Sequence, residues 1–315
     1  MTKYEKHGAL HVNKKGRLVD HLGEEVALHG FSSHGLSWYP EYMNRDTFEF
    51  MKNNWHIDIV RLAMYTDELD GYCVGDEANK QKLLEVIDRG VKAATELGLY
   101  IIIDWHILAD SNPLINKDEA VKFFDYVSDK YKAYGNVFYE ICNEPNVNCT
   151  WEDIKEYAQE VIPVIRRNDK YAVILVGTPS WSQKVNQALA NPITIDDNLM
   201  YVLHFYADTH RDELRGIFRG AAEAGLPLFI SEFGCCDASG RGDNNFEEAE
   251  KWIALADEFN TSFILWSLAN RDETCATFVP TCNKLTDFED EDIKPACKWY
   301  IGILDKHKDI AEEKK

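Results

Sequence analysis

The sequence predicts an α/β protein with the (β/α)8 fold, the TIM barrel. Three observations lead to this prediction: the number of apolar runs, their regular spacing, and the absence of a glycine-rich nucleotide-binding turn. The runs begin 27 to 41 residues apart, which leaves room for a helix after each strand. The eight runs cover residues 27–35, 58–65, 99–106, 137–144, 171–178, 199–206, 226–233 and 261–268.

The remaining segments predict the other elements of the barrel. Residues 10–28 contain short apolar stretches around turn residues, which indicates a small N-terminal hairpin at the barrel floor. Residues 79–97 have apolar side chains at helical spacing, and Gly98 stands where a C-terminal cap belongs. Further helices are expected over residues 119–131, 211–224 and 291–306, and after capping-box-like starts at residues 150–153 and 245–248.

Length and composition allow one large domain or two ordinary ones, and the eight-fold spacing favours one domain over residues 1–315. Hydrophobic residues make up 45% of the 315, enough for a core, and the net charge of −20 makes nucleic acid a poor partner. No apolar run approaches the roughly 18 to 20 residues of a membrane span, and residues 1–11 lack a secretory signal. We expect a monomer that is cytosolic, or a mature domain whose leader has been removed.

The eight cysteines predict neither a disulfide scaffold nor a zinc site. A chain of this length builds its core without covalent staples. The nearest cysteines are adjacent or seven residues apart, unlike the C-x2-C spacing that binds zinc. We expect most of the thiols to be buried or free, and we allow one or two disulfide bridges in the loops. The acidic residues 287–292 lack the spacing of a calcium loop.

Polar and aromatic side chains mark the ends of seven of the predicted strands. Charged groups there are costly to bury unless they are paired, and in this fold chemistry takes place at the carboxyl ends of the strands. A structural role would suffice for any one of them, but their convergence predicts a site. These residues are His34, Trp38, Arg61, Tyr65, Asp104, His106, Asn143, Glu144, His204, Tyr206, Ser231, Glu232 and Trp266.

Two carboxylates, Glu144 and Glu232, end strands that lie nearly opposite each other in a ring of eight. Facing glutamates are the equipment of glycoside hydrolysis, in which one protonates the leaving oxygen and the other attacks the anomeric carbon. A neighbouring anion raises the pKa of a carboxyl, so such a pair can separate into one neutral and one charged group. The sequence does not give the distance that separates a retaining from an inverting enzyme.

Four segments resemble glycoside hydrolase family 5, above all its bacterial endoglucanases, and the likeness extends over residues 16–303. The segments are Tyr139-Glu-Ile-Cys-Asn-Glu-Pro145, Ile103-Asp-Trp-His106, Leu203-His-Phe-Tyr206 and Phe229-Ile-Ser-Glu-Phe-Gly234. The resemblance implies a single catalytic domain and a retaining endo-β-1,4-glucanase acting on cellulose or soluble β-glucans, without a cofactor or metal. It also implies secretion, because a polymer cannot enter the cell; a cytoplasmic location stays an alternative.

The resemblance also implies roles for individual residues. Glu144 would be the general acid/base and Glu232 the nucleophile, with Arg61 and Tyr206 holding Glu232 ionised. Asn143 would bind the sugar 2-hydroxyl. The two histidines, His106 and His204, would bind sugar hydroxyls and the acid/base. With Trp266, these residues fill all eight of the positions usual in the family.

Aromatic side chains predict platforms for sugar rings, whose C–H faces stack on indole and phenol. Trp38, Tyr65, Trp181 and Trp266 are the candidates. By resemblance, the subsites on the non-reducing side would be lined by His34, Trp38, Tyr65, Trp266, Arg271 and Glu273. Related endoglucanases usually have Lys where Arg271 stands, which changes donor geometry at that subsite.

Three alternatives stay open at this point. The substrate could be another β-glycan, such as mannan, xyloglucan or mixed-linkage glucan. The chain could bind carbohydrate without cutting it, although both glutamates are intact. It could also be a metal-dependent barrel hydrolase with ligands drawn from His34, His106 and His204. Asp104, two residues before His106 on the same strand face, is expected to have a supporting role.

Overall fold

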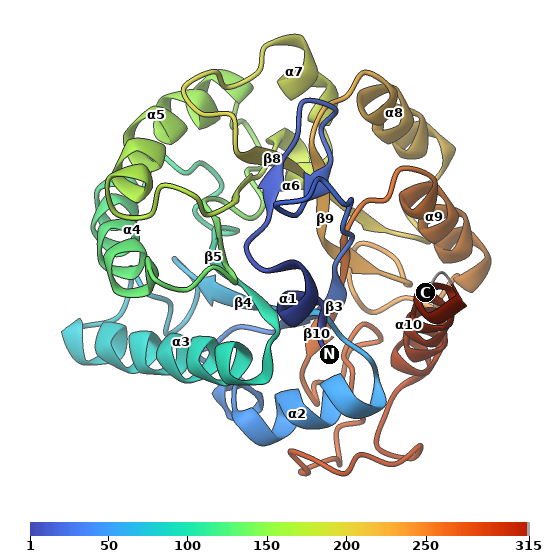
Figure 1. The fold of residues 1–315 in the computed structure, drawn as a ribbon. Coiled ribbons are helices and arrows are strands. Elements are labelled where there is room, and N and C mark those ends of the chain that lie inside the picture. Colours follow the sequence, from blue (N-terminus) through green and yellow to red (C-terminus); the bar gives the residue numbers. More distant parts are fainter. Residues whose placement is uncertain (314–315) are drawn as a thin grey trace.

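The computed structural model describes residues 1–313, with side chains described to residue 308, and confirms the predicted barrel. Eight parallel strands, β3 to β10, pair in chain order, and β10 pairs with β3 to close the ring. Figure 1 looks down this ring and shows the helices around it. The strands are His29–Ser33, Ile59–Tyr65, Tyr100–His106, Val137–Glu140, Ile174–Val176, Leu199–Tyr206, Leu228–Gly234 and Phe263–Leu268.

Helices follow the strands, and every predicted helix is present with slightly shifted ends. Gly98 caps α3 in the left-handed conformation, with φ 68° and ψ 35°. Thr150 and Asp153 exchange both bonds of a capping box at the start of α5. The helices are α2 (Arg45–Asn54), α3 (Glu77–Leu97), α4 (Lys117–Tyr131), α5 (Trp151–Asn168), α6 (Pro179–Ser182), α7 (Val185–Ala190), α8 (Asp212–Glu223), α9 (Phe246–Glu258) and α10 (Pro295–Glu313), with a 3-10 turn η1 at Pro40–Tyr42.

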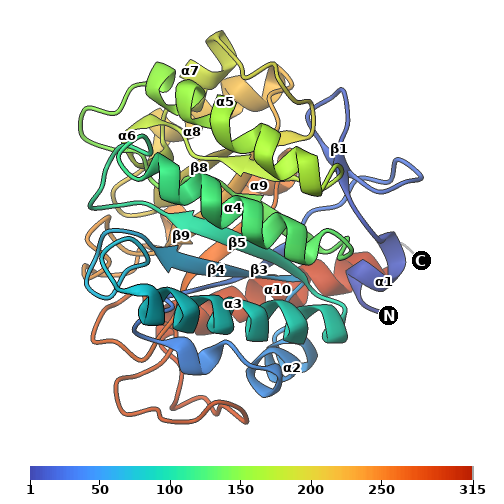
Figure 2. The same cartoon turned by 90° about the vertical axis from the view of Figure 1, so that its left-hand side faces the viewer.

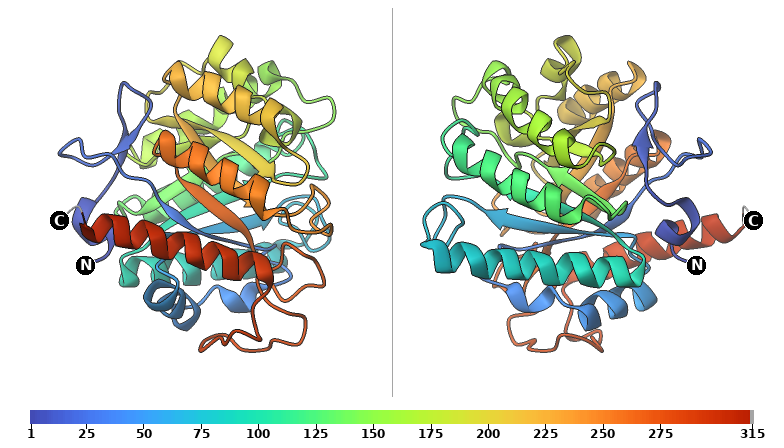
Figure 3. Two further views of the ribbon diagram at one scale, coloured as in Figure 1. Left: turned by 90° about the vertical axis from the view of Figure 1, so that its right-hand side faces the viewer. Right: turned by 60° about the vertical axis from the view of Figure 1, so that its left-hand side comes forward.

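The N-terminal segment closes one end of the barrel. Strands β1 (His11–Val12) and β2 (Leu18–Val19) pair antiparallel, which confirms the predicted hairpin. A short helix, α1 (Lys3–His7), precedes them and was not predicted. Figure 2 shows this segment at the end opposite the arrowheads of the strands, and Figure 3 shows α10 running along the barrel toward the same end. The opposite end is therefore left to the loops that follow the strands.

Strand alternation decides which side chains enter the barrel. Along β5, Tyr100 and Ile102 belong to the cluster inside the barrel, whereas Ile101 packs in the layer between barrel and helices. The same alternation directs Asp104 and His106 inward, above the apolar interior. The bottom of the barrel is thus filled with apolar side chains, and its top is polar.

A β-bulge in β9 departs from this alternation. The pairing of β8 with β9 shifts between Val202 and His204, because Val202 is opposite Phe229 whereas His204 is opposite Glu232. One extra residue on β9 is accommodated there, as a bulge allows. As a result, the consecutive residues Ser231 and Glu232 both contact groups inside the barrel.

Some predicted boundaries are wrong. The run at residues 137–144 forms a strand only as far as Glu140, so Asn143 and Glu144 lie beyond it. The run at 171–178 is reduced to β7, because only its middle pairs with both neighbours.

All eight cysteines are free thiols. Among the described residues, no helix has the length and apolar character that crossing a membrane requires.

Candidate active site

Most predicted site residues gather around one cleft of about 590 Å³ at the carboxyl ends of the strands. Arg61 and Asn143 lie beneath it and are completely buried. The cleft is lined by Tyr65, His106, Leu108, Glu144, Trp181, Gln183, His204, Tyr206, His210, Glu232, Ala238 and Trp266. The structure therefore brings the strand-end residues together, as convergence at one end of a barrel requires.

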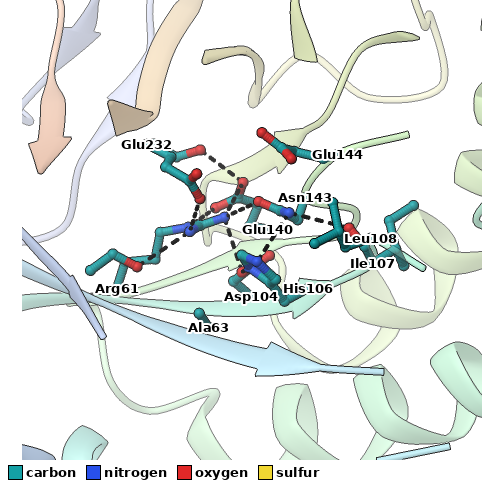
Figure 4. A network of polar contacts seen from close by, with 12 residues as sticks. Arg61, Ala63, Asp104, His106, Ile107, Leu108, Glu140, Asn143, Glu144 and Glu232 are labelled. Carbon is teal, nitrogen blue, oxygen red and sulfur yellow. Dashed lines mark hydrogen bonds and ion pairs between the residues drawn. The ribbon is translucent and has the colours of Figure 1, made fainter. Parts of the chain in front are cut away.

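Arg61, from β4, joins the acidic groups beneath the cleft (Figure 4). Its Nε donates to Glu140 Oε2 at 2.8 Å and its Nη2 to Glu140 Oε1 at 3.1 Å. Its Nη1 donates to Glu232 Oε2 at 3.2 Å, and its Nη2 lies 3.0 Å from Asp104 Oδ2. Because guanidinium is planar and permanently charged, one side chain can hold several buried carboxylates in fixed positions.

Glu232 has two donors that favour its charged form. Besides Arg61 Nη1, the Tyr206 hydroxyl donates to Glu232 Oε1 at 2.8 Å. Burial and the nearby Glu144 raise the pKa of Glu232, His204, Arg61 and Tyr206 oppose this, and the net value is about 7. The predicted neighbours Arg61 and Tyr206 are thus in place.

Glu144 lies on the segment that continues from β6 beside the end of β5. Backbone bonds from Asn143 N to Trp105 O (3.2 Å) and from Glu144 N to Ile107 O (3.4 Å) hold this segment against β5. The carboxyl faces His204, whose Nδ1 lies 2.9 Å from Glu144 Oε1. Burial raises the pKa of Glu144 to about 7, partly opposed by Arg61.

The two carboxyls face each other closely. One oxygen of Glu144, one oxygen of Glu232 and a ring nitrogen of His204 all lie within 4.8 Å of one another. The two carboxyls have unequal hydrogen-bond donors, because Arg61 and Tyr206 donate to Glu232 and neither donates to Glu144. This asymmetry favours negative charge on Glu232 and the proton on Glu144.

Asn143 and His106 form a second hydrogen-bonded chain (Figure 4). Asn143 Oδ1 accepts from Arg61 Nη2 at 2.6 Å, and its Nδ2 is 3.2 Å from both His106 Nε2 and Ile107 O. His106 Nδ1 lies 2.6 Å from Asp104 Oδ2. Asp104 thus has the supporting position that was expected, and burial holds the pKa of His106 well below its usual range.

Sequence reasoning missed Glu140 and made no prediction about the partners of Ser231. The Ser231 hydroxyl donates to Glu140 Oε1 at 2.8 Å, and its oxygen lies 2.9 Å from His204 Nε2. Glu140 is completely buried inside β6. A charged residue within an apolar strand run was the signal that could have drawn attention to it.

Three of the four predicted aromatic platforms, Trp38, Tyr65 and Trp266, form one group. His34 and His106 both pack against the Trp266 ring, at centroid distances of 5.1 and 5.3 Å, and the His106 ring is nearly parallel to it. The Tyr65 ring packs against the Trp38 ring in a tilted arrangement, with a centroid distance of 4.7 Å. Trp181 lies elsewhere on the cleft and is 44% exposed, so its face is available to a ligand.

Glu273 and Arg271 lie beside this aromatic group. Glu273 Oε1 is 3.1 Å from Arg271 Nε and 2.9 Å from Arg241 Nη2, and its Oε2 is 3.9 Å from His34 Nε2. Both predicted residues are therefore connected to the platform through His34. Arg241 was not predicted, because nothing in its local sequence indicates this contact.

The donor set of the metal-dependent alternative is not gathered. Among the described residues, two groups of three could offer ligand atoms to one ion, and neither includes His34 or His106. One is Glu144, His204 and Glu232, and the other lies at the barrel floor. A site built from His34, His106 and His204 is therefore not supported by the geometry.

Comparison with known proteins agrees with the fold and the cleft. The family model described as cellulase (glycosyl hydrolase family 5) matches residues 19–272. Endoglucanase A of Butyrivibrio fibrisolvens is 46% identical over 94% of this chain, and endoglucanase A of Evansella cellulosilytica is 44% identical over 87%. The chain spans 69% and 55% of these two relatives, respectively.

Solved structures show the same relationship. The catalytic domain of endoglucanase Cel5A from Thermobifida fusca has a TM-score of 0.91 and 35% identity, covering 97% of this chain and all of that one. The cellulase Cel5C_n has a TM-score of 0.90 and 40% identity, covering 95% of this chain and 92% of that one. With the matched family model and these identities, the chain belongs to the cellulases of glycosyl hydrolase family 5, enzymes of the endoglucanase type.

Proposed function

We propose that the protein is a retaining endo-β-1,4-glucanase that cuts cellulose-like or soluble β-glucan chains. The observation that carries the stereochemical part is the approach of Glu144 and Glu232 oxygens within 4.8 Å. Retaining enzymes separate their carboxyls by about 5 to 5.5 Å, whereas inverting enzymes need about 6.5 to 9.5 Å for a water molecule. The short separation favours direct attack by a carboxylate.

In the first step, Glu232 attacks the anomeric carbon while Glu144 gives its proton to the glycosidic oxygen. Arg61 and Tyr206 keep Glu232 ionised and aim it, because both donate to its carboxylate oxygens. In the second step, Glu144 takes a proton from water, whose oxygen replaces Glu232 on the sugar. Each carboxyl returns to its starting state.

Asn143 is the proposed partner of the sugar 2-hydroxyl. Both hydrogens of its amide already have acceptors, His106 Nε2 and Ile107 O, each at 3.2 Å. A hydrogen bond to the sugar would replace one of these long bonds. The new bond to the sugar then shortens as the transition state is approached. Asn143 is therefore a shared donor and not a free one.

Chain organisation and location complete the proposal. The stacked rings around Trp266 and the exposed face of Trp181 provide platforms for a sugar chain along the cleft. We infer a single monomeric catalytic domain that acts outside the cell, because an insoluble polymer is accessible only there. Mannan, xyloglucan and mixed-linkage glucan are the competing substrates, and turnover on that panel with cellulose ranks them.

The test combines stereochemistry with removal of the nucleophile. Proton NMR of the first product from a cello-oligosaccharide should show the β-anomer, and Glu232→Gly should lose on the order of 10⁴-fold in kcat on carboxymethyl cellulose. Glu68→Gln is the control and should keep its activity. Glu68 is another partly buried carboxyl, in the loop after β4, and it accepts a hydrogen bond from Ala109 N. Release of the α-anomer, or near-normal activity of Glu232→Gly, would contradict the proposal.

A further inference from the structure

A continuous chain of side chains leads from Arg61 to Glu144. Arg61 holds both oxygens of Glu140, at 2.8 and 3.1 Å. Ser231 Oγ bridges Glu140 Oε1 at 2.8 Å and His204 Nε2 at 2.9 Å, and His204 Nδ1 lies 2.9 Å from Glu144 Oε1. Arg61, Glu140 and Ser231 are completely buried, so water does not supply alternative partners.

The direction of each hydrogen bond in this chain follows from the number of hydrogens available. Burial raises the pKa of Glu140, but Arg61 donates N–H groups to both of its oxygens, and this paired guanidinium favours the anion, which only accepts hydrogen bonds. Ser231 has one hydroxyl hydrogen, and it donates this hydrogen to the Glu140 anion in a hydrogen bond. The Ser231 oxygen then presents a lone pair to His204, so His204 Nε2 must carry the hydrogen that fills that contact.

The hydrogen on Nε2 determines what faces Glu144. Burial lowers the pKa of His204 to about 4, so at neutral pH the ring carries a single hydrogen. With that hydrogen on Nε2, Nδ1 presents a lone pair to Glu144 Oε1 at 2.9 Å. A carboxylate would be repelled by this lone pair, whereas a carboxylic acid donates to it.

We propose that Glu140 and Ser231 are positioning residues that fix the tautomer of His204 and thereby keep Glu144 protonated in the resting enzyme. This inference rests on the proposed role of Glu144 and adds how its proton is held. In the first step the O–H bond of Glu144 breaks and the proton passes to the leaving oxygen. The Glu144 anion then faces the Nδ1 lone pair, which strengthens it as the base that takes the proton from water.

Other charged and titratable groups also face Glu144 and His204. They are distributed over four strands and one loop, and none of them donates to Glu144. They are Arg61 and Tyr65 from β4, Asp104 and His106 from β5, Tyr206 from β8, His210 from the loop after it, and Glu232 from β9. The tautomer of His204 is therefore the direct hydrogen-bond contact that favours the protonated form of Glu144, in addition to burial of its carboxyl and the donors that favour the Glu232 anion.

The first test needs no substrate, and its readout is taken on the wild-type protein. In ¹⁵N-histidine NMR of the wild-type protein near pH 6, His204 should show a protonated Nε2 and an unprotonated Nδ1, with its signals assigned by their loss in His204→Gln. A hydrogen on Nδ1 would overturn the proposal. Because this readout does not involve hydrolysis, it can fail while the endoglucanase activity stands, and the reverse also holds.

The second test uses the pH profile of kcat/KM on a soluble cello-oligosaccharide. Ser231→Ala removes the acceptor for His204 Nε2–H, so the ring can place its hydrogen on Nδ1 and donate to the Glu144 anion. The basic limb of kcat/KM should then move to lower pH by about one unit. The variant should lose roughly tenfold in kcat/KM at pH values above this limb and little at pH values below it. Ser231→Thr keeps the hydroxyl and should restore the wild-type limb. A uniform loss at every pH in Ser231→Ala, or an unchanged limb, would overturn the proposal.

Discussion

Within the cleft, side chains from neighbouring strands set one another's charge. Arg61 contacts Glu140, Asp104 and Glu232; the family resemblance implied the contact with Glu232, whereas those with Glu140 and Asp104 were not predicted. Ser231 and Glu140, which bond directly, are 91 residues apart in sequence. The motifs identified residue types suited to the chemistry. The partners across the barrel became visible only when the strands were in place.

The bond from Tyr206 to Glu232 predicts a shift of the acidic limb of activity. Tyr206→Phe removes a donor that favours the charged nucleophile, so the pKa of Glu232 should rise and the acidic limb of kcat/KM should move to higher pH. Losing a hydrogen bond to a charged group costs about 1.5 to 3 kcal/mol, or roughly tenfold or more in rate. Tyr201→Phe, whose hydroxyl bonds Ile193 N outside the cleft, should leave the limb in place; an equal shift there would contradict the assignment.

Glu144 predicts a pH-dependent cost in stability. The pKa of Glu144 in the folded state, about 7, lies above the ordinary value of 4.5. The protonated carboxyl therefore adds to the free energy of unfolding fully below about pH 4.5, and this contribution is lost as pH rises through 7. Glu144→Gln removes this dependence. The variant should be more stable than wild type above pH 7, by up to about 3 kcal/mol, and equal to it near pH 4.5.

Thermal denaturation at the two pH values measures this difference. Glu250→Gln on the exposed surface of α9 is the control and should change little at either pH. A Glu144→Gln variant that is less stable than wild type at pH 8 would show that Glu144 is stabilised as an anion, contrary to the geometry.

At the scale of elements, the position of Glu144 depends on how β6, β7 and their loops approach one another. Gly177, just after β7, donates its N–H to Cys142 O at 3.1 Å. A Cβ at Gly177 would lie 2.2 Å from that oxygen and 2.9 Å from Asn143 O. The backbone that carries Asn143 and Glu144 therefore requires a residue without a side chain beside it.

Gly177→Ala should displace this segment and lower both stability and activity. We expect a lower Tm and a loss of at least tenfold in kcat, because displacements of about 1 Å can cost 10²-fold in rate. Gly216→Ala is the matched control, since nothing lies within 4 Å of a Cβ there in α8 and alanine favours a helix by about 1 kcal/mol. Full activity in Gly177→Ala would show that the segment tolerates the shift.

At the scale of the whole molecule, the barrel brings Glu144, Glu232 and His204 together at one point, and the proposal gives these side chains roles in proton transfer and covalent attack. The proposed chemistry uses proton transfer and covalent attack by the chain's own residues. Activity on carboxymethyl cellulose should therefore be retained after dialysis against EDTA. A loss that is restored by adding back one divalent ion would return the metal-dependent alternative.

Local patterns determined a large part of this protein. The spacing of apolar runs predicted eight strands and the order of their helices, because burial on both faces of a parallel sheet imposes continuous apolar segments. Strand-end residues and the family resemblance singled out Glu144 and Glu232, whose roles stay predictions. Strand ends were less well predicted, as at Glu140, because pairing with neighbours and not local composition ends a strand.

The tertiary structure alone decided the distances and the direction of the hydrogen bonds. Closure of the ring brings Glu144 and Glu232 within 4.8 Å, and the bulge in β9 turns both Ser231 and Glu232 inward. The contacts of His204, which determine where its hydrogen resides, come from β6 and β9 together. Such features arise where segments far apart in the chain come into contact. The composition and spacing of any single segment do not predict these contacts.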